Sequence, residues 1–150
     1  MKWVTRARPK VDRVACPWLI RKWIDPQAEF LFVPPDQVLP VAEREGALSF
    51  DAPGARFDHR DGRCTFEVLL TEYGVDDPAL AELARIVHGA DVSGDEDHTP
   101  ESRGLKAIAE GFQLLLSDDH EILSREFAVY DALYAWCRTR VPASTAAHTR

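Results

Sequence analysis

The sequence lacks the features that mark secreted, disulfide-bonded and membrane-spanning proteins. No run of apolar residues approaches the roughly 20 residues that a membrane-spanning helix needs, so we expect no membrane partner. The N-terminal segment is basic, but it has neither the apolar stretch nor the small-residue cleavage site of a secretion signal. An odd, widely spaced set of three cysteines provides no disulfide framework; they are Cys16, Cys64 and Cys137. A cytoplasmic, reducing environment is therefore expected.

The chain also has fewer basic residues than acidic ones. The chain has 18 Lys and Arg residues against 25 Asp and Glu residues, which gives a formal net charge of −7. Proteins bind nucleic acid mainly by neutralising phosphates with Lys and Arg, so we expect no direct nucleic-acid partner. The chain has no Gly-rich phosphate loop, no GxSxG motif and no HExxH motif. The sequence therefore gives no support for assigning the chain to the nucleotide-binding, hydrolase or metalloprotease classes that carry those motifs.

Length and composition predict one domain. A chain of 150 residues, of which 45% are apolar, can bury a core of its own. We assign the domain to residues 1–140 and expect a flexible tail at 141–150, where no apolar periodicity occurs. The sequence leaves the oligomeric state open, a homodimer included.

The first half of the chain alternates short strand and helix patterns. Asp12 is expected to cap a helix that has Pro17 in its first turn and ends at the turn of Asp25 and Pro26. A second helix is expected at 37–45, before Gly46. Short strands are expected at 2–5, 29–33, 47–50 and 56–59.

The second half has helical patterns only. Asp77 followed by Pro78 predicts a helix start, and Gly89 predicts the end of that helix at His88. Helices are expected at 65–74, 77–88, 104–116 and 117–138. This order predicts an α+β fold: a small β-sheet packed against a mainly helical cluster, with the C-terminal half all helical.

Apolar residues that recur at helical or strand spacing predict the core. We expect the following side chains to be buried: Trp18, Trp23, Leu31, Leu69, Leu83 and Ile86. Aromatic residues also recur on the first and last predicted helices. Their spacing favours a role in the core over a role in lining a ligand pocket.

Three segments together resemble a known family. They are WVTRARPKVDRVACPWLIRKWID near the start, FDHRDGRCTFEVLLTEYG in the middle and DPALAELARIVHGADV just after it. The chain is similar to the C-terminal domain of ChrB-type chromate-resistance proteins over roughly residues 1–140. The resemblance implies a role in chromate resistance, and it implies that longer members act as chromate-responsive regulators. Their additional N-terminal region has no counterpart here, so a DNA-binding role located in that region is not carried over.

Histidine, cysteine and carboxylate residues in the middle of the chain suggest a metal site. We expect His59 at the end of a strand, Glu67 in the first turn of a helix, and His88 and Asp91 at the end of the next helix. Cys64 lies in the loop before Glu67 and completes the candidate set. Such ligands suit a divalent transition metal, zinc or iron, as a cofactor. The alternative is that the histidines are partly buried helix residues and the acids are helix-end residues.

Arginines near the start of the chain suggest an oxyanion site. Arg6, Arg13 and Arg21 flank the predicted N-terminus of the first helix, where free N–H groups attract anions. Guanidinium groups bind tetrahedral anions such as chromate or sulfate through charge-assisted hydrogen bonds. The alternative is that these arginines pair with acids of the fold. Cys16 is a candidate reactive thiol, because a helix N-terminus favours the thiolate, although a lone cysteine beside Trp18 is typical of a core residue.

Three hypotheses about function follow. The first is a metal- or oxyanion-binding module of the chromate or metal-stress response, with a sensory or regulatory role. The second is a metal-dependent enzyme, an oxidoreductase or a hydrolase, which an open coordination position would favour. The third is an interaction module, which a large exposed apolar patch would favour.

Overall fold

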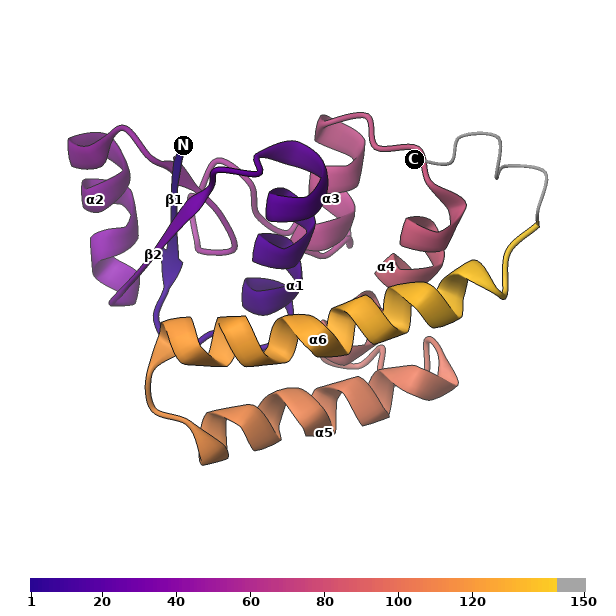
Figure 1. The fold of residues 1–150 in the computed structure, drawn as a ribbon. Helices are drawn as coiled ribbons and strands as arrows, with labels where there is room; N and C mark the ends of the chain where they lie inside the picture. The colour runs from indigo at the N-terminus through magenta and orange to yellow at the C-terminus, as the bar shows by residue number, and fades with distance from the viewer. Residues whose placement is uncertain (143–150) are drawn as a thin grey trace.

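A parallel sheet of three short strands lies at one end of the molecule, and helices make up the rest (Figure 1). The computed structural model describes residues 1–142, so the predicted tail at 141–150 falls almost entirely outside the described residues. The strands are β1 (Lys2–Arg6), β2 (Glu29–Val33) and β3 (Leu48–Ser49), in the order β2-β1-β3. The predicted α+β class is confirmed, but the strand predicted at 56–59 was wrong. Phe57 forms only an isolated bridge with Phe50, because the chain turns away after that single pair.

The first helix differs from its prediction at its start, whereas it ends before the turn of Asp25 and Pro26 as predicted. Helix α1 spans Asp12–Leu19 and continues as the π-helical turn η1 (Ile20–Ile24). Asp12 is the first residue of α1 and not its cap, since its carboxylate is used on another helix. Pro17 lies inside α1 rather than in its first turn. A proline at that position provides no N–H for the helix ladder, and the looser turn η1 begins three residues later.

Helix α2 (Val38–Glu45) follows a 3-10 turn, η2 (Pro35–Gln37), and ends at Gly46 as predicted. Gly46 has φ 64°, a left-handed conformation that glycine adopts without strain. The helix covers one face of the sheet with a small apolar cluster, which consists of Val4, Val38, Val41 and Ala52. The larger core lies on the other face of the sheet, among the remaining helices.

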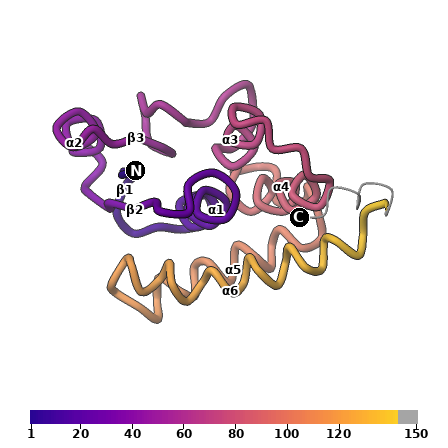
Figure 2. The backbone as a smooth tube through the Cα atoms, turned by 45° about the horizontal axis from the view of Figure 1, so that its top comes forward, coloured from indigo at the N-terminus to yellow at the C-terminus, as the bar shows by residue number. Residues whose placement is uncertain are grey.

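The second half is helical, as predicted. Its helices are α3 (Thr65–Glu72), α4 (Pro78–Asp91), α5 (Pro100–Leu115) and α6 (Asp119–Arg138). Helices α5 and α6 run side by side along one flank of the molecule (Figures 1 and 2). Helix α4 contacts α1, α3, α5 and α6, so it is the central element of this half. The Asp77 side chain accepts hydrogen bonds from the first backbone N–H groups of α4, which confirms the predicted helix start.

Gly89 does not end α4, because the helix continues to Asp91. The reason is close packing against α5. A Cβ atom at Gly89 would lie 2.2 Å from Oγ and 2.7 Å from Cβ of Ser102. Ser102 is fully buried and donates a hydrogen bond to the Ile86 carbonyl at 3.0 Å. Gly89 therefore permits a close contact between α4 and α5 and is not a helix-stop residue.

Gly89→Ala is expected to lower the free energy of unfolding by about 1–3 kcal/mol, the usual cost of overpacking a filled core. Gly111→Ala is the matched control, since Gly111 lies within α5 and a Cβ there would meet nothing within 4 Å. That control should stabilise the protein by up to about 1 kcal/mol through helix propensity. Urea denaturation of both variants measures the difference. Equal effects at the two sites would contradict the close approach of α4 to α5.

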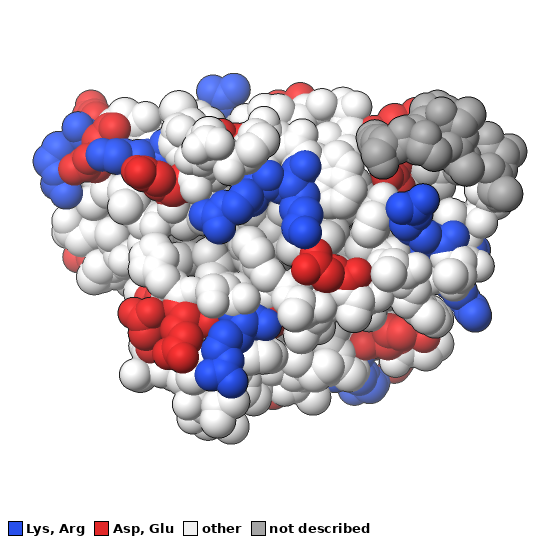
Figure 3. Space-filling view, viewed as in Figure 1, with Lys and Arg blue, Asp and Glu red and all other residues white. Residues whose placement is uncertain are grey.

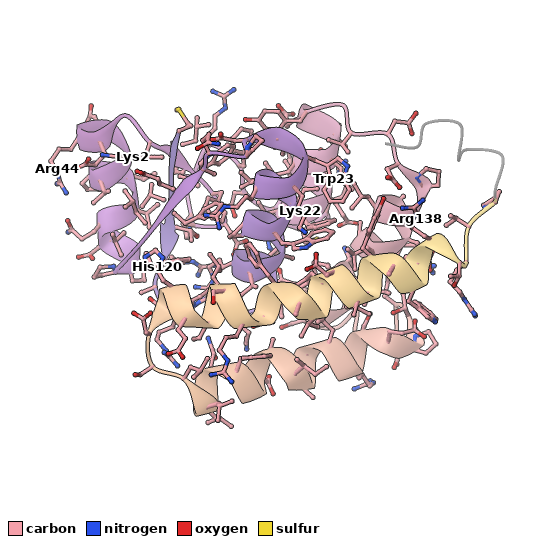
Figure 4. All side chains as sticks on the ribbon, viewed as in Figure 1. Lys2, Lys22, Trp23, Arg44, His120 and Arg138 are labelled. Carbon is pink, nitrogen blue, oxygen red and sulfur yellow. The ribbon has the colours of Figure 1, made fainter. Side chains whose placement is uncertain are left out.

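The predicted core is confirmed at four positions and wrong at two. Trp18, Leu69, Leu83 and Ile86 are at most 1% exposed, and the last three lie on α3 and α4. Trp23 and Leu31 are only partly buried. Trp23 lies on η1 (Figure 4). Its ring packs against Trp18 with 5.2 Å and edge-on against Tyr134 with 5.1 Å between ring centres, and these contacts leave the side chain partly exposed. Leu31 lies on β2, at an edge of the sheet, where one side of the strand has no neighbour.

Candidate functional site

Four polar side chains converge beyond the carboxyl ends of β1 and β3. Asp12 begins α1, Asp51 follows β3, His59 lies in the loop before α3, and Asp91 ends α4. Loops that follow parallel strands meet at one edge of a sheet, which is where α/β proteins commonly bind ligands. We call these four residues the carboxylate–histidine cluster.

The imidazole of His59 lies among the three carboxylates. Its Nε2 atom is 3.0 Å from Oδ2 of Asp91, 3.4 Å from Oδ1 of Asp51 and 3.5 Å from Oδ2 of Asp12. One donor atom from each residue lies within 4.8 Å of the others. The side chains of Asp12 and Asp51 are 0% and 4% exposed, whereas that of His59 is 43% exposed. Solvent therefore reaches the cluster from the His59 side.

The Asp12 carboxylate is fixed by the N-terminus of α3. Its Oδ2 accepts a hydrogen bond from the Thr65 N–H at 2.7 Å, and its Oδ1 accepts one from the Phe66 N–H at 3.2 Å. The Cys16 thiol, 3.6 Å away, also donates to Oδ1. The Thr65 hydroxyl donates to Oδ1 of Asp51 at 2.8 Å. One residue of α3 thus orients two carboxylates of the cluster.

Burial and mutual charge shift the pKa values of these groups. Burial and the negative charge of Asp91 raise the pKa of Asp12 to about 8. The hydrogen bond from His59 acts in the opposite direction but is outweighed. Hydrogen bonds to Asp12, Asp51 and Asp91 raise the pKa of His59 to about 12. Burial alone would raise the pKa of Asp51, but hydrogen bonds from His59 and Thr65 and the charge of Arg13 lower it below its usual value. The cluster therefore holds protons that a cation could displace.

Two of the three predicted anion-binding arginines border the cluster. Arg6 donates from Nε to the Asp51 carbonyl at 2.9 Å and from Nη2 to its Oδ2 at 3.4 Å. Nε of Arg13 lies 3.5 Å from the same Oδ2. Arg21 contacts other elements: it donates to the Ala28 carbonyl at 2.9 Å and lies 5.0 Å from the ring centre of Phe30. The structure thus brings Arg6 and Arg13 together and does not add Arg21 to them.

One residue of the cluster, and one residue next to it, have backbone φ angles in the left-handed region. Val11, directly before Asp12, has φ 47°, and Asp51 has φ 50°. This conformation is a clear outlier for a β-branched residue such as valine. Each such residue costs on the order of 1–3 kcal/mol, and residues of this kind concentrate at functional sites.

The five predicted metal ligands divide between two neighbouring groups. His59 and Asp91 belong to the carboxylate–histidine cluster, whereas Cys64, Glu67 and His88 form a second group of potential ligands. His59 lies in a loop and does not end a strand, which corrects its predicted position. Glu67 lies in the first turn of α3, as predicted.

The predicted reactive thiol, that of Cys16, is completely buried. Cys16 is 0% exposed, and burial together with the charge of Asp12 raises its pKa well above the usual value. The thiol is in the middle of α1 and not at its N-terminus, so the helix end does not favour the thiolate. Its contact with the Asp12 carboxylate is that of a hydrogen-bond donor.

Sequence reasoning missed Asp12 and Asp51 as site residues. Asp12 was interpreted as a helix cap, and Asp51 was not singled out. A signal was available for Asp51, since it directly follows a predicted strand, and acids in that position gather at the edge of a parallel sheet. No local pattern indicated that Asp12 would accept hydrogen bonds from residues 53 and 54 positions further along the chain.

The face drawn in Figure 3 shows no large patch of one charge sign. Basic and acidic side chains are interspersed there among uncharged surface. Among residues 1–142, no helix combines the length and the hydropathy needed to cross a membrane.

Fold and site together define a small α+β domain with a partly enclosed carboxylate–histidine cluster beside its sheet. The profile of the family described as ChrB, C-terminal domain, matches residues 3–137. Protein ChrB of Cupriavidus metallidurans is 42% identical over 136 residues, which are 89% of this chain and 40% of that protein. No solved structure matches. The chain belongs to the ChrB C-terminal domain family, which associates it with chromate resistance, and it spans about two fifths of the length of this relative.

Proposed function

We propose that this domain binds a divalent transition-metal ion, zinc or iron, through Asp12, Asp51, His59 and Asp91, and that this binding serves the response to chromate or metal stress. The proposal depends on one observation: four donor atoms from four separate segments lie within 4.8 Å of one another. An imidazole nitrogen combined with carboxylate oxygens is a donor set that such ions accept.

The charges of the cluster support a cation. Three carboxylates surround one imidazole, and two of them are almost completely buried. Carboxylates that share a buried site repel one another unless a proton or a metal ion neutralises them. In the metal-free domain, the protons on His59 and Asp12 fill this role. A divalent ion would displace them and compensate the same carboxylates.

Arg6 and Arg13 support an oxyanion as the second ligand. Above the Asp12 pKa of about 8, where all three carboxylates are ionised and His59 is still protonated, the formal charges of three carboxylates, two guanidinium groups and one imidazolium sum to zero. With a neutral His59 and a divalent ion, they sum to one net positive charge. A site of that charge, next to two guanidinium groups, attracts chromate or a similar anion. Metal binding would therefore precede anion binding.

A metal-dependent enzyme is the second candidate, because His59 is 43% exposed and leaves one side of the cluster open to solvent. A metal held there could keep a coordination position for water or substrate. Elemental analysis of protein purified without a metal-affinity tag tests both candidates. Near-stoichiometric zinc or iron is expected, and protein that takes up neither ion after incubation would rule both out.

The order of binding gives a separate prediction. Sulfate should raise the melting temperature of the metal-loaded domain by more than chloride at matched ionic strength, by about 2–4 °C for each kcal/mol of binding free energy. Above the Asp12 pKa of about 8, metal-free protein should respond equally to both salts. Arg6→Ala should abolish the sulfate effect, and Arg21→Ala should retain it, since Arg21 contacts other elements. A sulfate effect that is lost in Arg21→Ala and kept in Arg6→Ala would refute the assignment.

A further inference from the structure

The second group of potential ligands lies at the start of α3, next to the carboxylate–histidine cluster. Cys64 caps α3, Glu67 is three residues further on, and His88 lies one turn before Asp91 on α4. Donor atoms from these three side chains lie within 4.8 Å of one another. We call them the thiol–histidine group.

Local hydrogen bonds hold the three side chains in place. Oε1 of Glu67 accepts a hydrogen bond from the Cys64 N–H at 2.8 Å and lies 2.8 Å from Nδ1 of His88. The Cys64 sulfur accepts from the Glu67 N–H, which completes a capping box. The Cys64 thiol is 0% exposed and the His88 side chain 8% exposed. The group is therefore enclosed and ordered around a single helix start.

The carboxylate of Asp95, which contacts the ring nitrogen of His88 that does not face Glu67, independently indicates that His88 is a metal ligand. Nε2 of His88 lies 2.6 Å from Oδ2 of Asp95, in the segment between α4 and α5. Ligand histidines usually donate their second ring N–H to a carboxylate, which fixes the tautomer and turns the other nitrogen toward the metal. Here that other nitrogen is Nδ1, the atom that faces Glu67. The His98 ring packs against His88 with 4.5 Å between ring centres and limits its rotation.

We propose that Cys64, Glu67 and His88 form a second metal site, with one sulfur, one oxygen and one nitrogen donor, which selects a thiophilic divalent ion such as zinc. This site is separate from the carboxylate–histidine cluster and does not depend on metal binding there. A bound metal deprotonates the thiol that coordinates it. The sulfur donor distinguishes this site chemically from the first, whose four ligands are imidazole and carboxylates.

Cobalt(II) titration followed by ultraviolet absorption tests the proposal directly. Cobalt replaces zinc at sites of this kind, and only a thiolate ligand produces a sulfur-to-cobalt charge-transfer band. Wild-type protein should develop this band and lose it once two equivalents of zinc are added, one for each proposed site. Cys64→Ser should lack the band. Serine is a preferred helix cap, so this variant should keep the start of α3 and remain folded.

The other two cysteines are the matched controls. Cys16→Ser and Cys137→Ser should keep the band, and His88→Ala should weaken cobalt binding by at least about 10-fold. His59→Ala should also keep the band, so failure of the first site would not be mistaken for failure of the second. Absence of the band in wild-type protein at saturating cobalt, or its persistence in Cys64→Ser, would overturn the proposal. Circular dichroism confirms that each variant is folded.

Discussion

Replacing His59 with alanine is expected to weaken metal binding at the carboxylate–histidine cluster by at least about 100-fold, because even an outer-shell partner of a metal ligand is worth about 10–100-fold. His59 supplies the only nitrogen of this donor set, and its Nε2 lies within 3.5 Å of all three carboxylates. Isothermal titration with zinc measures the loss, in a Cys64→Ser background that lacks the proposed sulfur site. His120→Ala is the matched control, since His120 is exposed at the start of α6 beside Phe32 (Figure 4).

The same titration should depend steeply on pH. Metal binding requires a neutral imidazole, whereas the carboxylates raise the pKa of His59 to about 12 in the metal-free domain. Zinc must therefore displace a proton at neutral pH, and its affinity should rise about tenfold per pH unit for each proton released. Conversely, the ion pairs of His59 stabilise the metal-free fold fully below the unfolded pKa of about 6.5 and lose this effect as the pH rises toward 12. An affinity that does not change between pH 6 and pH 8 would contradict a proton-displacing site.

Asp12→Ala is expected to destabilise the metal-free protein by about 2–4 kcal/mol, because it leaves two buried backbone N–H groups without an acceptor, at about 1–3 kcal/mol each. Those groups belong to Thr65 and Phe66, and both residues are 0% exposed. Above the Asp12 pKa of about 8, the loss of one negative charge beside Asp51 and Asp91 offsets part of this cost. Urea denaturation in the presence of a chelator measures the net effect.

Two controls separate the causes of this effect. Asp12→Asn keeps an acceptor oxygen and the side-chain volume, so it should lose less than half as much stability while still impairing metal binding. Asp77→Ala removes the helix cap of α4, which costs about 0.5–2 kcal/mol, and also the acceptor of the Tyr134 hydroxyl at 2.7 Å, which adds about 0.5–1.5 kcal/mol. A loss below about 0.5 kcal/mol in Asp12→Ala, the usual range for surface substitutions, would show that this carboxylate does not support α3.

Local signals predicted most of the fold. The cap at Asp77, the left-handed glycine at Gly46 and the strand at 29–33 depend on neighbouring residues alone, and all three are confirmed. The errors arose where tertiary packing overrides a local signal. Gly89 has the local signature of a helix end, yet its missing side chain is used for the contact with Ser102. Pro17 similarly lies inside a helix whose stability comes from burial of its other residues.

The candidate site was harder to predict because its ligands are far apart in the sequence. His59 and Asp91 could be proposed from residue type, but only the packing of α1 against α3 and α4 brings Asp12 to them. Glu67 and His88 have the chemistry of metal ligands, and nothing in their spacing separates them from His59 and Asp91. The division into two groups follows from the position of α3, whose first turn contacts both.

A crystal structure of zinc-soaked protein, with an anomalous difference map recorded at the zinc edge, tests the central claim most directly. The account predicts a peak about 2.0–2.2 Å from Nε2 of His59 and from carboxylate oxygens of Asp12, Asp51 and Asp91. His59 would then be neutral. Bonds from its Nε2 atom and from the three carboxylates to the metal would replace the ion pairs between His59 and those carboxylates. A map without a peak among these four side chains at saturating zinc, with His59 still paired to all three carboxylates, would contradict it.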